Sequence, residues 1–345
     1  MSSRLPIDRH AIIRDSYTYS VEMYKRRLLK LLTMPPENQH GGAKMMEESN
    51  WTIEQIPDLT GRVVVVTGAT SGLGEEAADV LAGKNATIVM GVRDTEKGER
   101  VAANIREKRP GAKVLVSKLD LANLSCVSAF SAKFLSGFDR LDLLINNAGV
   151  MFCDYRATED GFEPQMGTNH FGHFALTGRL LPLLKDTANS RVVVTSSVAH
   201  RSGKIDIADI NWKRRKYNTT QAYCDSKIAN LFFCYELSRR LKKGGGGPTV
   251  TVAHPGWTRS ELQRHSGMMR FLNKLFSQGP EMGVLPTLRA AFDQSAMPGD
   301  YFGPSKLFEM HGYPVVVSSN KRSHDRDVAR QLWDLSEEMT GVTYA

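Results

Sequence analysis

The sequence lacks an apolar run long enough to cross a membrane, and its N-terminus lacks the continuous apolar core of a signal peptide. Its four cysteines are not spaced as metal ligands, so we expect reduced thiols. His170 and His173 are three residues apart but have no third ligand at a suitable spacing, so we expect packing or polar roles and no metal. Only 8% of the residues are aromatic and the basic residues are scattered, which argues against nucleic-acid binding despite a net charge of +8. From these absences we expect a cytoplasmic globular protein.

Residues 1–50 differ from the rest of the 345-residue chain, because they are polar, mixed in charge and broken by Pro35-Pro36 and Gly41-Gly42. We predict a partly flexible N-terminal extension over 1–50 and a single domain over 51–345. Within the extension, residues 24–32 combine basic and apolar side chains. They allow weak contact with a membrane surface, which would make the protein peripheral to it, although a helix docked on its own domain is the simpler interpretation.

A glycine-rich turn follows the first predicted strand. This strand, residues 61–67, is a β-branched run without polar alternation, which is typical of a strand buried on both faces of a parallel sheet. Glycine clusters are common in loops. One placed between a strand and a helix favours a dinucleotide pyrophosphate, because glycines admit the backbone closely and the helix N-terminus attracts phosphate. The candidate cofactor-binding residues are Gly68, Thr70, Ser71, Gly72, Leu73 and Gly74.

The second predicted strand, residues 86–91, bears on the choice of cofactor. A site for NAD usually places a carboxylate about 20 residues beyond the glycines, against the ribose 2′-hydroxyl. Counted from Gly74, that position falls at Val92 and Arg93, and a guanidinium suits a 2′-phosphate through its fork of hydrogen bonds. Asp94 is close enough to keep NAD as the alternative. We predict NADP(H).

Further strands are predicted at residues 113–120, 141–145, 191–195, 249–253 and 313–318. Asp120 ends the third strand, where it and Leu121 could meet the adenine ring; a turn or helix-cap role for Asp120 is equally consistent. The fourth strand enters Asn147, Ala148 and Gly149, where small residues let the chain turn beneath a flat ligand. The pattern predicts an α/β fold, with a doubly wound, seven-stranded, mostly parallel sheet and helices on both faces.

Tyr223 and Lys227 are the strongest candidates for chemistry. They are four residues apart in a segment that suits a buried helix, so they would share one face of that helix. Most Tyr–Lys pairs at this spacing are surface pairs. An ammonium beside a phenol stabilises the phenolate and lowers the pKa of the phenol from about 10 toward the range of effective general acid–base catalysis. At the end of the fifth predicted strand, Ser196 or Ser197 could hydrogen-bond a substrate oxygen; we choose Ser197.

In these motifs, which occur in order over residues 58–340, the sequence resembles the short-chain dehydrogenase/reductase family. Four segments are similar to the retinol dehydrogenase-like branch: Asn169-His-Phe-Gly-His-Phe174, Ser196-Ser-Val-Ala-His200, Ala222-Tyr-Cys-Asp-Ser-Lys227 and His254-Pro-Gly256. The resemblance implies a Rossmann-type catalytic domain with a catalytic tetrad of Asn169, Ser197, Tyr223 and Lys227. It also implies that Pro255, Gly256 and Thr258 lie on the nicotinamide amide.

The resemblance implies a role for each member of the tetrad. Tyr223 would exchange a proton with the alcohol or carbonyl oxygen, and Lys227 would support it and bind the nicotinamide ribose. Ser197 would orient the substrate oxygen and stabilise developing charge. Asn169 would hold a water that leads from Lys227 to solvent. The expected activity is the NADP(H)-dependent interconversion of an alcohol and a carbonyl, with the cofactor supplying the hydride.

Residues 259–285 are amphipathic and could form a mobile cover over an apolar pocket, although an ordinary core helix is as consistent. Such a cover suggests a lipophilic substrate of the retinoid, steroid or fatty-aldehyde type. The helix over residues 222–241 is apolar on more than one face, which allows a homodimer, a lid or the N-terminal extension to cover one of them. Two alternative functions are an inactive nucleotide-binding scaffold or sensor and a peripheral membrane protein acting through residues 24–32.

Overall fold

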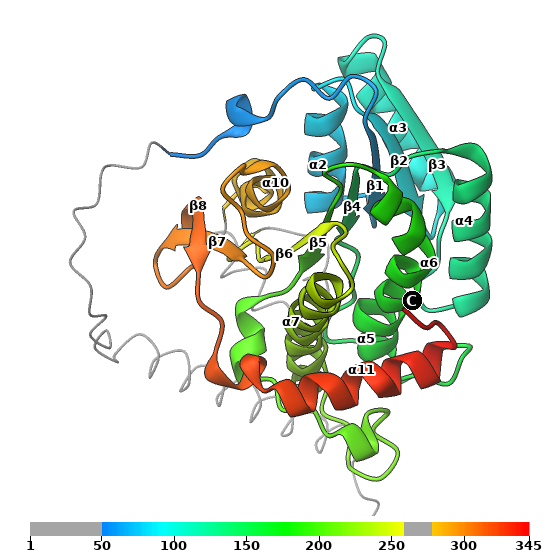
Figure 1. The fold of residues 1–345 in the computed structure, drawn as a ribbon, viewed down its shortest axis with the longest axis vertical. Helices are drawn as coiled ribbons and strands as arrows, with labels where there is room; N and C mark the ends of the chain where they lie inside the picture. Colours follow the sequence, from blue (N-terminus) through cyan, green and yellow to red (C-terminus); the bar gives the residue numbers. More distant parts are fainter. Residues whose placement is uncertain (1–49, 259–277, 345) are drawn as a thin grey trace, which may run out of the picture. The chain divides into compact units, whose positions relative to one another are not determined.

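The described residues form one eight-stranded sheet at the centre of the fold (Figure 1). The computed structural model describes residues 50–258 and 278–344. The predicted extension up to residue 49, its basic segment 24–32, and residues 259–277 of the predicted cover lie outside the described residues. The strands are β1 (Val63–Thr67), β2 (Thr87–Val92), β3 (Lys113–Lys118), β4 (Leu143–Asn146), β5 (Arg191–Thr195), β6 (Thr249–Ala253), β7 (Tyr301–Lys306) and β8 (His311–Val317).

The strand order is β3-β2-β1-β4-β5-β6-β7-β8, with parallel pairing as far as β7 and an antiparallel pairing of β7 with β8. The predicted fold class, a mostly parallel doubly wound sheet, is confirmed. Because β1 and β4 are neighbours while the chain winds outward from them in opposite directions, the switch point lies between these two strands. Ligands bind at the carboxyl ends of the strands beside such a point.

The predicted count of seven strands is wrong, because β7 was missed. Its sequence contains Gly303 and Pro304, which usually break strands. The structure tolerates them because β7 pairs with β6 only through Tyr301 and Phe302. Beyond these residues β8 is its single partner, and the register shifts near Pro304. The strand predicted at 313–318 is β8.

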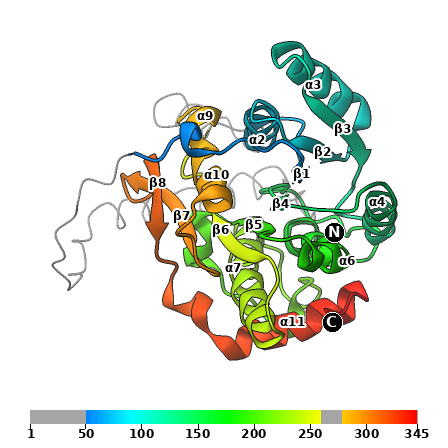
Figure 2. The ribbon, with the colours of Figure 1, turned by 45° about the horizontal axis from the view of Figure 1, so that its top comes forward.

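Helices cover both faces of the sheet. The described helices are α2 (Gly72–Ala82), α3 (Thr95–Lys108), α4 (Leu124–Gly137), α5 (Pro164–Met166), α6 (Gly172–Asp186), α7 (Thr219–Lys243), α9 (Pro280–Gly283), α10 (Leu285–Phe292) and α11 (Arg326–Thr340). Helices α2, α3 and α10 lie on one face and α4, α6 and α7 on the other, with α11 outside α7 (Figure 2). Among the described residues, no helix is long and apolar enough to cross a membrane.

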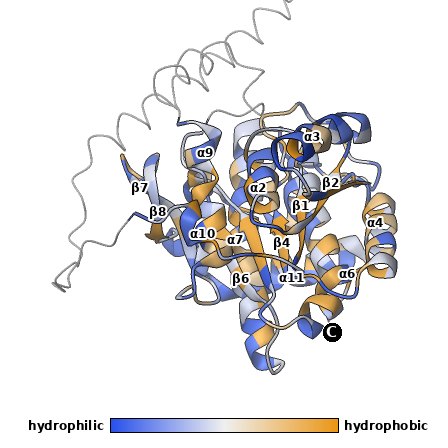
Figure 3. Ribbon diagram, turned by 90° about the horizontal axis from the view of Figure 1, so that it is seen from above, coloured by the Kyte–Doolittle hydropathy of each residue, from blue (hydrophilic) through white to orange (hydrophobic). Residues whose placement is uncertain are grey.

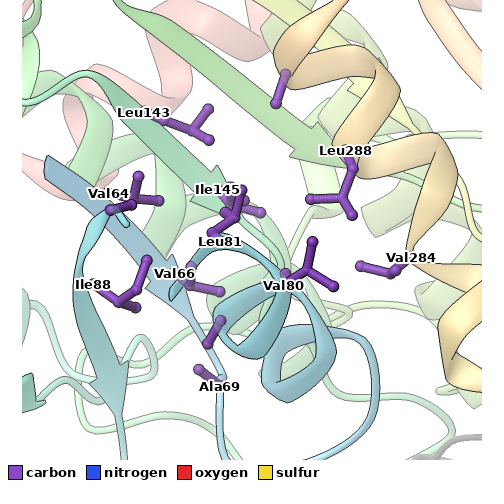
Figure 4. Packing of buried hydrophobic residues seen from close by; sticks show 14 of the residues in the cluster. Val64, Val66, Ala69, Val80, Leu81, Ile88, Leu143, Ile145, Val284 and Leu288 are labelled. Carbon is purple, nitrogen blue, oxygen red and sulfur yellow. The ribbon is translucent and has the colours of Figure 1, made fainter. Parts of the chain in front are cut away.

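The central strands are apolar on both sides, as the β-branched run predicted. All five residues of β1 are buried. Val64 and Val66 belong to one buried cluster with Leu81 of α2 and, from far along the chain, Leu288 of α10 (Figure 4). Val63 and Val65 belong to the cluster on the opposite face. In Figure 3 the hydrophobic colour accordingly concentrates on the strands between the helical layers. Because these strands are buried on both faces, their carboxyl ends, which carry the candidate site residues, are held in place.

Helix α7 is buried on two faces within the chain itself. One face packs on the sheet, and the other meets α11, where the Phe233 ring stacks on Trp333 with centroids 6.0 Å apart. Arg240 adds a cation–π contact to the same Trp333 ring, at 4.4 Å from its centroid. Helix α11 therefore covers this apolar face of α7 around Phe233.

Candidate active site

The glycine-rich turn between β1 and α2 has the backbone of a phosphate cradle. Gly68 and Gly72 have φ of +68° and +58°, a region that side chains with a Cβ rarely adopt. A Cβ on Gly74 would lie 2.4 Å from the Gly68 carbonyl oxygen and 2.6 Å from Asn147 Nδ2, so only glycine fits there. Ser71 precedes α2 without capping it through its side chain, which leaves the first N–H groups of the helix directed at the turn.

The Thr67 hydroxyl joins this turn to the loop after β4. It accepts hydrogen bonds from the N–H groups of Asn147 and Ala148, each at 2.9 Å, and lies 2.9 Å from His173 Nε2. Because His173 Nδ1 faces the Asn169 carbonyl oxygen at 3.1 Å, Nδ1 donates there and Nε2 accepts from Thr67. Burial lowers the pKa of His173 to about 4, which keeps the ring neutral. This is a polar role, one of the two expected for His173, although the sequence did not indicate its partners.

Arg93 and Asp94 have different surroundings at the end of β2. The Asp94 carboxylate accepts a hydrogen bond from Lys97 N at 2.9 Å and caps α3, so it already has a local structural role. Arg93 is exposed, and Lys118 Nζ donates to its carbonyl oxygen at 2.6 Å. Two cationic side chains therefore lie at the neighbouring carboxyl ends of β2 and β3, and the sequence analysis identified only Arg93.

Asp120 and Leu121 lie in the turn after β3. The Asp120 carboxylate accepts a hydrogen bond from Ala122 N at 3.0 Å, so its side chain stabilises this turn, which was one of the two predicted roles. The cap of α4 is Asn123, which accepts from Cys126 N at 2.8 Å. Leu121 is buried, and its carbonyl oxygen lies against Gly172 at the start of α6.

Asn169 connects the loop after β4 with helix α7. It lies in a π-helical turn, Gly167–Phe171, that leads into α6. Its side-chain amide accepts a hydrogen bond from Val150 N at 2.8 Å and donates to the Val150 carbonyl at 3.0 Å and to Ser226 Oγ at 2.9 Å. A Cβ on Gly149 would lie 3.1 Å from Asn169 Oδ1 and 3.6 Å from Lys227 Nζ, so these three predicted site residues meet at one place.

Tyr223 and Lys227 share one face of α7, as their spacing predicted. Lys227 Nζ lies 5.7 Å from the centroid of the Tyr223 ring and donates a hydrogen bond to the Thr195 carbonyl oxygen at 3.3 Å. Lys227 is 4% exposed, and this burial lowers its pKa to about 8. The pair is therefore buried in the fold, and it has none of the character of a surface pair.

Ser196 and Ser197 differ in what their hydroxyl groups contact. The Ser196 side chain is buried and donates to the Lys227 carbonyl oxygen at 2.8 Å, so it fastens the end of β5 to α7. Ser197 is partly exposed, and its hydroxyl accepts from Ala199 N at 3.2 Å at the start of the turn Val198–Ser202. This difference favours Ser197 as the serine that meets substrate.

Phe152 was not predicted, yet its ring packs against the catalytic candidate Tyr223. The two ring centroids are 5.4 Å apart with planes at 67°, an edge-to-face contact. Phe152 has φ of +54°, which is unusual for a residue with a side chain, and its N–H donates to Gln165 Oε1 at 2.9 Å. An aromatic wall thus stands beside the tyrosine.

Pro255, Gly256 and Thr258 follow β6, at the same edge of the sheet as the other predicted site residues. Thr258 Oγ1 donates to the Pro255 carbonyl oxygen at 2.7 Å, and Gly256 has φ of +64°. In the described part of the chain, no group of three or more histidine, cysteine or acidic side chains could hold a metal ion. The arrangement brings a phenol and an ammonium next to the loop after β4, which lies against the glycine-rich turn, and this suits proton transfer beside a bound cofactor.

Comparison with known proteins identifies the class. Residues 62–270 match the family model for short chain dehydrogenase, and the chain belongs to this family. It is 41% identical to retinol dehydrogenase 13 of Homo sapiens over 295 residues, covering 82% of this chain and 86% of that protein. It is 43% identical to retinol dehydrogenase 11 of Homo sapiens over 289 residues, covering 82% and 87%. The resemblance to the retinol dehydrogenase-like branch is thereby confirmed, and the protein is an oxidoreductase of the alcohol dehydrogenase type.

Solved structures agree with this assignment. A crystal structure of an uncharacterized protein from Mycobacterium paratuberculosis is 40% identical, with a TM-score of 0.73, and the match covers 86% of this chain and all of that one (100%). A short chain dehydrogenase from Shigella flexneri, complexed with NADP, is 26% identical with a TM-score of 0.56 over 71% of this chain and 97% of that chain.

Proposed function

We propose that this protein interconverts an alcohol and a carbonyl with NADP(H), with Tyr223 as the acid–base residue. The observation that carries the proposal is the buried Tyr223–Lys227 pair beside a glycine cradle that excludes any Cβ at Gly74. The residues fit the cofactor: the N-terminus of α2 would hold the pyrophosphate, and Gly149, next to Lys227, leaves room for a flat ring. When bound, the cofactor supplies or accepts the hydride.

Each member of the tetrad has a distinct task in this proposal. Tyr223 gives a proton to the carbonyl oxygen in reduction and takes it back in oxidation. Lys227, held by the Thr195 carbonyl, supports the phenolate by its charge and binds the ribose. Ser197 donates to the substrate oxygen. Asn169, which joins Val150 to Ser226, fixes the loop against α7 and holds the water that connects Lys227 with solvent.

We propose NADP(H) rather than NAD(H) because Arg93 and Lys118 lie at the ends of β2 and β3, while Asp94 caps α3. The test is a fluorescence titration of the protein with NADPH and with NADH. We expect NADPH to bind at least about tenfold more tightly, and Arg93→Ala to remove most of this difference, because one charge-assisted phosphate contact is lost. Arg100→Ala, another exposed arginine, on α3, is the matched control and should keep it. Equal affinity of the wild type for both nucleotides would contradict the choice of NADP(H).

We further propose a lipophilic carbonyl or alcohol as substrate, of the retinoid, steroid or fatty-aldehyde type. Support comes from the Phe152 ring at Tyr223 and from the retinol dehydrogenases among the relatives. Retinaldehyde and long-chain aldehydes should be reduced with NADPH, whereas Tyr223→Phe should bind NADPH normally and lose turnover about 1,000-fold, within the range of acid–base catalysis. NADPH binding without turnover of any carbonyl by the wild type would instead identify a nucleotide-binding scaffold.

A further inference from the structure

The loop between β7 and β8 has a strained backbone. Leu307, Phe308 and Glu309 follow one another with φ of +51°, +56° and +65°, and none of them is glycine. Such conformations persist only where the surroundings enforce them. The side chains of Leu307 and Phe308 are 66% and 56% exposed, so their burial cannot enforce the loop. The Glu309 side chain, by contrast, is only 20% exposed.

The Glu309 carboxylate joins two segments of the active site. One oxygen lies 2.6 Å from Arg201, in the turn that follows Ser197, and the other lies 3.1 Å from Nε2 of His254, which directly precedes Pro255. Burial raises the pKa of Glu309, but the hydrogen bond from His254 and the charge of Arg201 outweigh it and lower the pKa overall. The carboxylate is therefore ionised.

His254 passes this contact on to the backbone of the next residues. Its ring is fully buried, and burial lowers its pKa, so it is neutral. Nδ1 lies 3.2 Å from Gly256 N and must accept that hydrogen bond, so Nε2 carries the proton and donates it to Glu309. An acceptor at Glu309 thus selects the tautomer whose Nδ1 can hold the Gly256 N–H.

The residue after Glu309 contacts the same segment through its backbone. The Met310 carbonyl oxygen accepts from Trp257 N at 2.9 Å, and a Cβ on Gly256 would lie 2.4 Å from that oxygen. The position of the β7–β8 loop therefore decides where the chain from Pro255 to Thr258 runs.

We propose that Glu309 is a positioning residue for the nicotinamide half of the cofactor, acting through His254 on the backbone of residues 255–258. The proposal rests on the proposed function, because the family motif places this segment on the nicotinamide amide. The strained loop brings Glu309 to His254, and the Nε2 proton of His254 directs the ring. A residue that only stabilised the fold would affect both halves of the cofactor equally.

The experiment compares two ligands by titration: NADPH, and its 2′-phosphorylated ADP-ribose half, which lacks nicotinamide. We expect Glu309→Ala to weaken NADPH about tenfold, the effect of one lost hydrogen bond at a charged group, and to leave the half-cofactor within about twofold. Glu309→Gln keeps an acceptor for Nε2 and should restore NADPH binding to within about threefold of the wild type. Glu338→Ala, at an exposed glutamate of α11, controls for the loss of one negative charge.

The outcomes separate this inference from the proposed function. If the wild type binds neither ligand, the proposed function fails. If the wild type binds both and Glu309→Ala changes neither, or weakens both to the same extent, Glu309 does not position the nicotinamide half. Because Glu309→Gln alters the side chain so little, it still tests the inference if Glu309→Ala does not fold: a tenfold loss of NADPH with this variant overturns the tautomer argument.

Discussion

At the scale of single residues, the proposed acid–base residue Tyr223 packs against a neighbour that is itself held in place. The Phe152 ring meets the Tyr223 ring edge-to-face at 5.4 Å, while its strained backbone is held by Gln165. Gln165 is held in turn, since its amide nitrogen donates to Tyr217 Oη at 2.9 Å and to the Thr219 carbonyl oxygen at 2.8 Å. Phe152 is therefore kept in place before any substrate arrives.

We predict that Phe152→Ala raises KM for a lipophilic carbonyl about tenfold, because one partly buried aromatic contact contributes about 1.4 kcal/mol. KM for a small water-soluble carbonyl should change much less. Phe152→Leu, which keeps an apolar side chain of similar reach, is the control and should retain most of the affinity. Steady-state kinetics on both substrates give the answer, and an equal rise in KM for the two would mean that Phe152 does not contact the lipophilic part.

Sequence alone could nominate the proposed tetrad because the spacing of its members carries the signal. Tyr223 and Lys227 are one helical turn apart, and Asn169 lies in a recognisable segment. Phe152 has no such signal, because its orientation depends on Gln165, 13 residues further along. The sequence could not distinguish Ser196 from Ser197 either, because the difference lies in the hydrogen bond from Ser196 to the carbonyl oxygen of Lys227, 31 residues further along the chain.

At the scale of elements, the cofactor turn and the loop after β4 are fastened at Thr67. Its hydroxyl uses its full capacity, with one donated bond to His173 and two accepted bonds from Asn147 and Ala148. Asn147 returns a bond to the Thr67 carbonyl oxygen at 2.9 Å. The Thr67 hydroxyl therefore links β1 to the loop after β4 and to α6.

We predict that Thr67→Val lowers the free energy of unfolding by about 3 kcal/mol and weakens NADPH binding, because two N–H groups and one buried imidazole nitrogen lose their partner. Thr67→Ser keeps the hydroxyl and should lose less than about 1 kcal/mol. Urea unfolding gives the first quantity and NADPH titration the second. A valine variant as stable as the serine variant would show that the hydroxyl network contributes little.

The elements that the sequence predicted correctly have regular patterns, and those that it missed do not. The β-branched runs of β1 and β5 and the long α7 follow their periodicity. Strand β7 contains Gly303 and Pro304 and is a strand because it pairs with β8 along its length and with β6 through Tyr301 and Phe302. Likewise, the second apolar face of α7 gave no indication that α11 would cover it, because that contact joins residues about a hundred positions apart.

At the scale of the whole molecule, the core contains several neutral histidines. Burial lowers the pKa of His170 to about 3 and those of His173 and His200 to about 4, and it also lowers the pKa of His254. In an unfolded chain these histidines would have a pKa of about 6.5. Below that pH the unfolded state takes up protons that the folded state does not, so the folded state loses stability as the pH falls.

Asp225 opposes this trend but cannot cancel it. Burial raises its pKa to about 6, so between about pH 6 and pH 4 the folded state binds one proton that the unfolded state does not. Burial also raises the pKa of Glu163 and Glu76, but the four buried histidines, together with Asp142 and Asp209, whose hydrogen bonds outweigh burial and lower their pKa values, act in the opposite direction. The net proton uptake on unfolding is therefore positive over this range.

We predict that the free energy of unfolding falls steeply between about pH 6.5 and pH 4, by about 1.36 kcal/mol per pH unit for each proton taken up in excess. His170→Asn should flatten the fall by the slope of about one proton, because burial lowers the pKa of His170 to about 3 and the variant removes this group. Urea unfolding at a series of pH values measures both slopes. A wild-type stability that stays constant or rises toward pH 4 would mean that the histidines open to solvent and take up protons without unfolding.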